Sequence, residues 1–120
     1  MQRGKDFQAP VKLTIKPGFH INTNMPGDKY LIPLRITWDN KLVESGKTEF
    51  PAGKKSTFPF SSTPVSVYEG NVELIQHFKV KADATPGLSS VTGTLHYQAC
   101  TDKECHPPTS TRVRLGLDLR

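Results

Sequence analysis

SSVTGTLHYQAC, residues 89–100, is the stretch that decides the fold. Its apolar positions fall on one parity, Val91, Leu95, Tyr97 and Ala99, with Gly93 on the same side. Successive side chains of a strand point to opposite faces of a sheet, so this alternation predicts a half-buried strand. Cys100 falls on the polar parity. A cysteine kept only as a small core residue would be expected on the apolar one.

The same alternation recurs along the rest of the chain. It predicts strands at Val11–Ile15, Phe19–Asn22, Leu34–Asp39, Val72–Val80 and Arg112–Leu119, with weaker candidates at Val43–Phe50 and Phe58–Phe60. Turn residues separate these segments, as at Pro17-Gly18, Asp39-Asn40 and Pro86-Gly87. No window has the i, i+3, i+4, i+7 apolar spacing of an amphipathic helix. About seven to nine short strands with turns between them are typical of an all-β antiparallel sandwich.

Length and composition agree with a small folded domain. The chain has 120 residues, and we expect residues 1–120 to form a single domain, with residues 1–10 as a flexible start or an artificial extension. Leu, Ile, Val and Phe make up about 24% of the residues, above the roughly 20% below which a core is hard to bury. No run approaches 18 apolar residues, so no membrane span is expected, and the first residues lack the apolar segment of a signal peptide.

The charge pattern indicates a solvated surface. Sixteen basic and eleven acidic residues leave a net charge of +5, and the basic residues are scattered singly apart from Lys54-Lys55. An arginine-rich run and an aromatic-plus-glycine motif are both missing from the sequence. We therefore expect no nucleic-acid partner.

The two cysteines, Cys100 and Cys105, are separated by four polar residues and predict a hairpin. Opposed residues of paired strands lie about 4.5–5.5 Å apart at Cα, within reach of a disulfide. Pro107 and Pro108 cannot donate to a strand ladder, so the pair should lie near an edge, where a partner can reach it. A bridge closing so short a loop stabilises by roughly 2 kcal/mol, against about 4 for one closing half the domain. The spacing alone leaves a redox-active bridge and a structural bridge equally open.

A zinc site is a third reading, because His96, Cys100, Cys105 and His106 are close in sequence. On one extended strand, however, His96 and Cys100 would lie roughly 13 Å apart, too far to share an ion. The three remaining side chains do not make a closed structural site. The C-x-x-C-H motif of haem attachment and the C-x-x-C motif of thioredoxin are also missing. We therefore expect no metal and no other cofactor.

Several segments together carry a resemblance to a known family. They are Ile15–Ile21 (IKPGFHI), Val67–Gly70 (VYEG), Leu95–Cys100 (LHYQAC), Cys105 and Pro107-Pro108. In these segments the chain resembles the N-terminal domain of the DsbD-type thiol:disulfide interchange proteins. The likeness runs from about Val11 to Leu117, and YQAC with Cys105 and the two prolines is its most specific part. It implies an immunoglobulin-like sandwich in the periplasm, as part of an inner-membrane protein.

The function that the resemblance implies is a relay of electrons with protein-disulfide reductase activity. The Cys100/Cys105 pair would take electrons from the thioredoxin-like domain of the same transporter. It would pass them to oxidised periplasmic thiol proteins, a disulfide isomerase or a thioredoxin-like protein of cytochrome maturation. A monomer is expected. The alternative is an immunoglobulin-like binding or structural module whose disulfide is inert.

The resemblance also implies roles for individual residues. Cys105 matches the cysteine that forms mixed disulfides with partners, and Cys100 matches the resolving one. Tyr68, with Glu69 beside it, matches the aromatic of a cap loop that covers the pair when no partner is docked. His20 and Asn22 fall where the family places side chains beside the pair. Without the resemblance, Tyr68 would be interpreted as an edge aromatic and His20 as a surface histidine.

One departure from the family pattern concerns the same loop. Ser66 and Val67 stand where some members carry acidic residues just before the cap aromatic. We therefore do not expect proton transfer from acidic side chains of this loop. Between the two cysteines, the carboxylates of Asp102 and Glu104 disfavour the thiolate form of either cysteine, while Lys103 favours it. Neither thiol is therefore expected to be strongly acidic.

Overall fold

The computed structural model describes residues 2–39 and 42–119, and these residues form strands and no helix. The strands are β1 (Asp6–Thr14), β2 (His20–Asn22), β3 (Arg35–Trp38), β4 (Val43–Glu49), β5 (Lys54–Ser56), β6 (Val65–Tyr68), β7 (Asn71–Val80), β8 (Gly87–Tyr97), β9 (Ala99–Cys100) and β10 (Thr109–Leu119). Every pairing between them is antiparallel. Within the described residues, no helix is long and apolar enough to cross a membrane. The predicted all-β class is confirmed.

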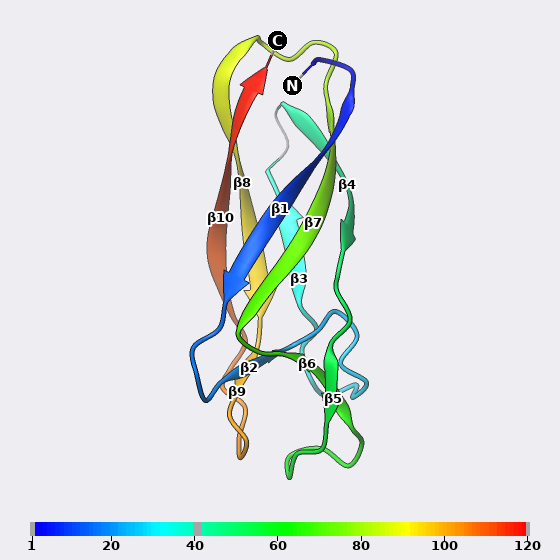
Figure 1. Ribbon diagram of the computed structural model, residues 1–120, viewed down its shortest axis with the longest axis vertical. Coiled ribbons are helices and arrows are strands. Elements are labelled where there is room, and N and C mark those ends of the chain that lie inside the picture. The colour runs from blue at the N-terminus through cyan, green and yellow to red at the C-terminus, as the bar shows by residue number, and fades with distance from the viewer. Residues whose placement is uncertain (1, 40–41, 120) are drawn as a thin grey trace.

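Two three-stranded sheets form the body of the molecule, in the orders β1-β7-β4 and β10-β8-β3 (Figure 1). Their inward residues pack against one another: Val43 and Phe78 from the first sheet meet Val91 and Leu117 from the second. Leu74, fully buried, lies in a second cluster with Val11 and Leu95. Side chains from both sheets thus share one core, and the expected immunoglobulin-like sandwich is confirmed.

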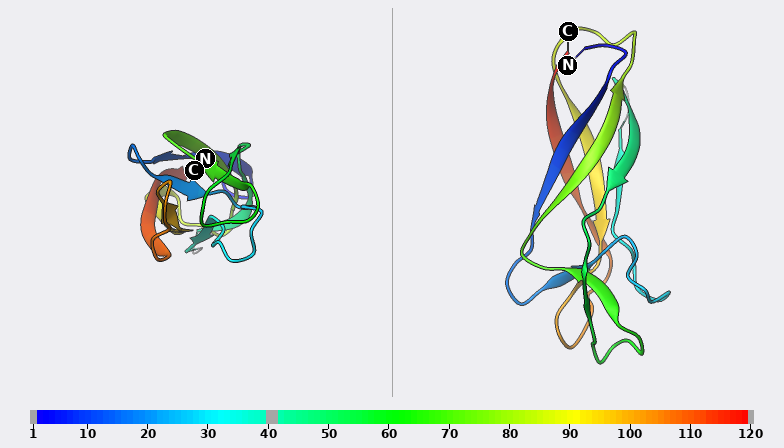
Figure 2. Two further views of the ribbon diagram at one scale, coloured as in Figure 1. Left: turned by 90° about the horizontal axis from the view of Figure 1, so that it is seen from below. Right: turned by 45° about the vertical axis from the view of Figure 1, so that its right-hand side comes forward.

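A smaller four-stranded sheet, β5-β6-β2-β9, lies at the end of the molecule opposite the two termini (Figures 1 and 2). Strand β2 is one of its two inner strands and pairs with β6 on one side and with β9 on the other. All three residues of β2 are buried, which is why a strand of only His20, Ile21 and Asn22 can be stable. This sheet carries Cys100 and its neighbours.

The first strand begins earlier than the alternation predicts. Residues 6–10 pair with residues 75–79 as part of β1, so they are not a flexible start. Their pattern is harder to detect because Pro10 and exposed polar residues interrupt it, while Ala9 alone is buried. A strand at a sheet edge needs apolar residues on one face only and tolerates proline.

Two further boundaries differ from expectation. Phe58–Phe60 is not a strand, and Pro59 and Phe60 form a turn between β5 and β6. The run from residue 89 to 100 divides at Gln98, since β8 ends at Tyr97 and β9 leaves to pair with β2. Asn40, in the expected Asp39-Asn40 turn, lies outside the described residues.

Candidate functional site

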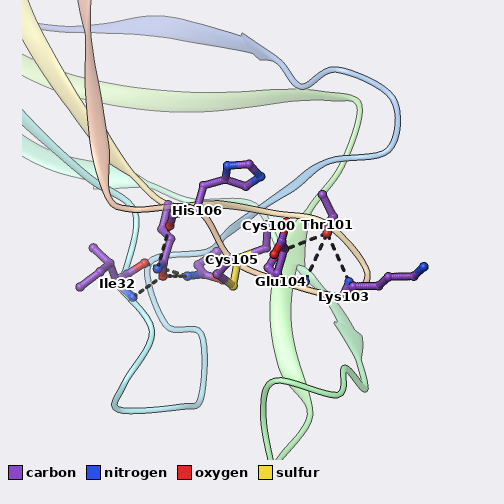
Figure 3. Close-up of a disulfide and its surroundings, with 9 residues drawn as sticks. Ile32, Cys100, Thr101, Lys103, Glu104, Cys105 and His106 are labelled. Atoms are coloured by element: carbon purple, nitrogen blue, oxygen red, sulfur yellow. Dashed lines mark hydrogen bonds between the residues drawn. A yellow bond between two sulfur atoms is a disulfide. The ribbon is translucent and has the colours of Figure 1, made fainter.

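The cysteine hairpin forms as predicted. Cys100 and Cys105 oppose each other in an antiparallel bridge and are joined by a disulfide with a Cα–Cα distance of 4.0 Å (Figure 3). Between them, the Thr101 amide donates to the Glu104 carbonyl at 2.8 Å. The Thr101 hydroxyl accepts the amides of Lys103 and Glu104 at 3.3 and 3.2 Å. The threonine therefore closes the turn locally.

The two cysteines differ in their exposure to solvent. Cys100 is 0% exposed although its parity is polar, because the chain leaves the large sheet at Gln98 and β9 packs against β2. Cys105 is only partly buried. Of the two cysteines, Cys105 is therefore the one more open to a thiol of another protein.

His20 lies directly opposite Cys100 in the β2–β9 register and is 1% exposed. Its ring stacks on Phe58, with centroids 4.4 Å apart, and Phe58 stacks on Phe60 at 5.0 Å. The His20 Nε2 atom has no hydrogen-bond partner among the described residues. Burial lowers the pKa of His20, while the carboxylates of Glu69 and Asp102 act in the opposite direction. Burial thus favours the neutral form of the imidazole beside Cys100.

This buried histidine should make the protein less stable in acid. Because the pKa of His20 is lowered below its ordinary 6.5, the unfolded chain binds more protons than the folded one below about pH 6.5. The free energy of unfolding should therefore fall as the pH drops below that value, by at most about 1.4 kcal/mol per pH unit. His20→Phe, which keeps the stack on Phe58 but cannot titrate, should remove this component, as urea denaturation between about pH 7.5 and 5 would show. If His96→Phe, which removes a histidine from β8, abolished the same component, the assignment to His20 would be contradicted.

A polar network ties the hairpin to the rest of the small sheet (Figure 3). The Gln98 Oε1 atom accepts from the Asn22 side chain at 3.1 Å and from the Ile32 amide at 3.0 Å. The Asn22 side chain also donates to the Ile32 carbonyl at 3.0 Å. The Gln98 Nε2 atom donates to the carbonyl of His106 at 3.3 Å. One amide thus links β2, the loop at Ile32 and the residue that follows Cys105.

Gln98→Ala should loosen the hairpin. The change removes the acceptor of the Ile32 amide and of one of the two Asn22 side-chain hydrogen bonds, which costs about 1–3 kcal/mol of unfolding free energy. It should also raise the alkylation rate of reduced Cys105, because the following carbonyl is no longer held. Gln8→Ala, at an exposed position of β1 far from the hairpin, is the matched control and should stay within about 0.5 kcal/mol of the parent. Equal unfolding free energies and alkylation rates in the two variants would refute the role of Gln98.

Tyr68 and Glu69 occupy different environments. Tyr68 ends β6 opposite Ile21, is 4% exposed and packs with Leu74 and Leu95. Its hydroxyl donates to the Pro51 carbonyl at 2.6 Å. Glu69 is exposed in the turn that follows and acts electrostatically on His20. The structure therefore brings Glu69 near the site, whereas the Tyr68 ring belongs to the core below it.

The sequence reasoning missed Phe58 and Phe60 as site residues. Their rings cover His20, the neighbour of Cys100, and Phe58 is 8% exposed. The signal was the alternation of two aromatics around Pro59, which indicated a weak strand instead. In the described parts of the chain, no three His, Cys, Asp or Glu side chains are placed to hold a metal ion.

Fold and site together define an immunoglobulin-like domain with a disulfide-bonded cysteine pair at one end, in which Cys100 is buried and Cys105 is partly exposed. The chain belongs to the family of the N-terminal domain of the thiol:disulfide interchange protein DsbD, whose family model matches residues 1–117. Thiol–disulfide exchange is the chemistry of this family, and the bonded Cys100–Cys105 pair supplies its reactive group. A comparison with curated protein sequences finds no match.

Two solved structures similar to this chain support the fold. The reduced N-terminal domain of DsbD from Neisseria meningitidis is 19% identical with a TM-score of 0.60, and the match covers 91% of this chain and 76% of that one. The N-terminal periplasmic domain of ScsB from Proteus mirabilis is 16% identical with a TM-score of 0.67, covering 98% of this chain and 43% of that one. At these identities the likeness concerns the fold.

Proposed function

We propose that this domain works in the periplasm as an electron relay attached to an inner-membrane protein. A thioredoxin-like domain of the same transporter would reduce the Cys100–Cys105 disulfide. The reduced pair would then act as a protein-disulfide reductase on oxidised periplasmic thiol proteins, an isomerase or a cytochrome-maturation thioredoxin-like protein. The observation that carries the proposal is the difference in access between the partly exposed Cys105 and the fully buried Cys100.

The uptake of electrons follows from this difference. A donor thiolate attacks the Sγ atom of Cys105, a mixed disulfide forms, and Cys100 leaves as a thiolate that takes up a proton. The second donor thiolate then attacks the donor sulfur of the mixed disulfide and releases the Cys105 thiolate. Two electrons have entered the domain, and the donor is left as a disulfide.

Delivery reverses these steps on a different protein. The Cys105 thiolate attacks an acceptor disulfide, and one acceptor sulfur leaves as a thiolate. Cys100 then attacks Cys105 and releases the second acceptor sulfur, so the acceptor is reduced to a dithiol. The resolving thiol needs to meet Cys105 alone, and the burial of Cys100 agrees with that role. The domain acts as a monomer in both steps.

We assign the neighbouring residues supporting roles. Asn22 holds β2 against the cysteine strand through its hydrogen bond to Gln98, and His20 anchors β2 to the segment between β5 and β6 through its stack on Phe58. The capping role expected for Tyr68 remains a prediction. Because its ring is packed in the core, Tyr68 would shield the cysteine pair without moving, and the exposed Glu69 would lie beside it at the surface. Access to the pair would then be limited by packing around Cys100.

The reduction potential tests the relay against an inert disulfide. A relay should equilibrate with dithiothreitol or glutathione buffers at a potential well above about −300 mV, whereas a structural bridge should lie below that value. The reduced domain should also transfer its electrons to an oxidised thioredoxin-like protein. A potential below about −300 mV, with no transfer, would favour the binding or structural module instead.

A further inference from the structure

A groove with a volume of about 730 Å³ lies between β1 and β10 on one open side of the sandwich. Figure 1 shows these two strands next to each other, each at the edge of its sheet. The walls are apolar: Val11 and Leu13 come from β1, Ile15 follows that strand, and Val113 and Leu115 come from β10. Volumes of this size are typical of ligand sites. These inward residues recur at every second position, which is the spacing of side chains along an extended peptide.

The backbone beside the groove is open to an added strand. Strand β10 pairs with β8, and on its other side the described residues provide no partner strand. Half of the backbone amides and carbonyls of such an edge strand point away from its neighbour and remain free to pair. No proline interrupts β10 from Thr109 to Leu119, whereas β1 carries Pro10. An extended peptide can therefore extend the sheet at β10.

The charges at the groove select an acidic occupant. Lys12, Lys16, Arg112 and Arg114 line it, and no carboxylate does so among the described residues. Glu73 stands opposite Lys12 in the β1–β7 register, which leaves Lys16, Arg112 and Arg114 for an incoming acid. Two copies of this chain pairing through β10 would bring arginines together, which disfavours a second copy as the occupant.

The groove also continues to the cysteine end. Phe19, Ile21 and Ala99 line its lower part. Ala99 precedes Cys100, and the Phe19 ring lies 5.7 Å from the His106 ring, beside Cys105. A protein that exchanges disulfides at Cys105 can therefore place a neighbouring segment of its own chain along β10.

We propose that this groove binds an extended, acidic segment of the redox partner, in which acidic or other polar side chains alternate with apolar ones, as an added strand on β10. The identity of the partner rests on the proposed function, whereas the peptide site itself rests on the strand edge, the apolar walls and the basic side chains. The site would add affinity for partners whose reactive disulfide is flanked by such a segment.

The direct test uses a fluorescent peptide, EVTVEVTVE, and the whole domain in its disulfide form. The peptide should bind, with amide shifts in NMR spectra concentrated on residues 109–117. The lysine analogue KVTVKVTVK should bind at least about tenfold more weakly, since several attractive cross-strand charge pairs become repulsive. Absent binding of EVTVEVTVE, equal binding of the two peptides, or shifts located elsewhere would overturn the proposal.

Matched charge reversals locate the site. R112E/R114E should weaken binding at least about tenfold, while K54E/K55E, with the same change in net charge on β5, should stay within about twofold. Equal effects of the two variants would mean attraction by net charge alone and would overturn the proposal. Competition against the fluorescent peptide gives a further test. If dodecanoate, at or below its micellar concentration, displaces the fluorescent peptide while unlabelled peptide does not, the groove is an acyl-chain site and the proposal is overturned.

A separate arm distinguishes the peptide site from the redox function. R112E/R114E should be reduced by dithiothreitol at the parent rate, because the small reductant does not use the groove. Loss of peptide binding with this rate retained would support the site without touching the relay. A parent protein that binds the peptide but transfers no electrons to any thioredoxin-like protein would keep the site and reject the relay.

Discussion

Cys100→Ser should convert the domain into a trap that holds its redox partner as a stable mixed disulfide on Cys105. The buried Cys100 is the sulfur placed to resolve that bond, and a serine hydroxyl cannot do so. Multiple-turnover exchange should therefore fall to the rate of the uncatalysed reaction, while the first attack on the partner still occurs. This is the largest effect on activity that we expect from a single substitution.

The trap is measured by mixing reduced Cys100→Ser protein with an oxidised thioredoxin-like protein and resolving the products on a non-reducing gel. We expect a covalent heterodimer that dithiothreitol separates by reducing the mixed disulfide. Cys105→Ser is the matched control, because it leaves only the inaccessible sulfur, and it should give no heterodimer. Trapping by Cys105→Ser and not by Cys100→Ser would reverse the assigned roles, and trapping by neither would refute exchange through this pair.

Gly93→Val should produce a large loss of stability. Gly93 is opposite Trp38 in the β3–β8 register, and a Cβ atom there would lie 2.7 Å from Trp38 Cε3 and 3.0 Å from the Thr37 carbonyl oxygen. Trp38 cannot easily yield, because its ring packs edge-on against Phe78 with centroids 5.0 Å apart. Forcing extra atoms into such packing costs about 1–3 kcal/mol of unfolding free energy.

The control for this substitution is Gly116→Val on β10. No atom lies within 4 Å of a Cβ built at Gly116, so the added side chain meets open space and valine suits a strand. Urea denaturation should show a loss for Gly93→Val and a change within about 0.5 kcal/mol for Gly116→Val. Similar losses of unfolding free energy in both variants would show that any side chain added to β8 or β10 is harmful. The close contact with Trp38 would then not be the cause.

The long strands could be predicted because their pattern is local. β7, β8 and β10 each span ten or eleven residues, and alternation over that length points to one face. β5, β6 and β9 have two to four residues each, too few to show a period. Those short strands are stable because of their partners in the small sheet, which are distant in the chain.

The same distinction holds for the site. The spacing of Cys100 and Cys105 predicted a hairpin and a disulfide from neighbouring residues alone, and both are confirmed. The partners of that hairpin could not be predicted this way. His20 comes to it from eighty positions away along the chain, and Phe58 covers His20 from a turn that resembled a strand.

By itself the sequence determined the all-β class, the positions of the long strands and the chemistry available to a lone pair of cysteines. Only the tertiary structure decided that Cys100 is buried and Cys105 reachable, since the parity of residues 89–100 places Cys100 with polar residues. The chain changes sheet at Gln98, where β8 ends and β9 begins to pair with β2. Alternation records which way a side chain points from its own strand, whereas access depends on which other strands pack over it.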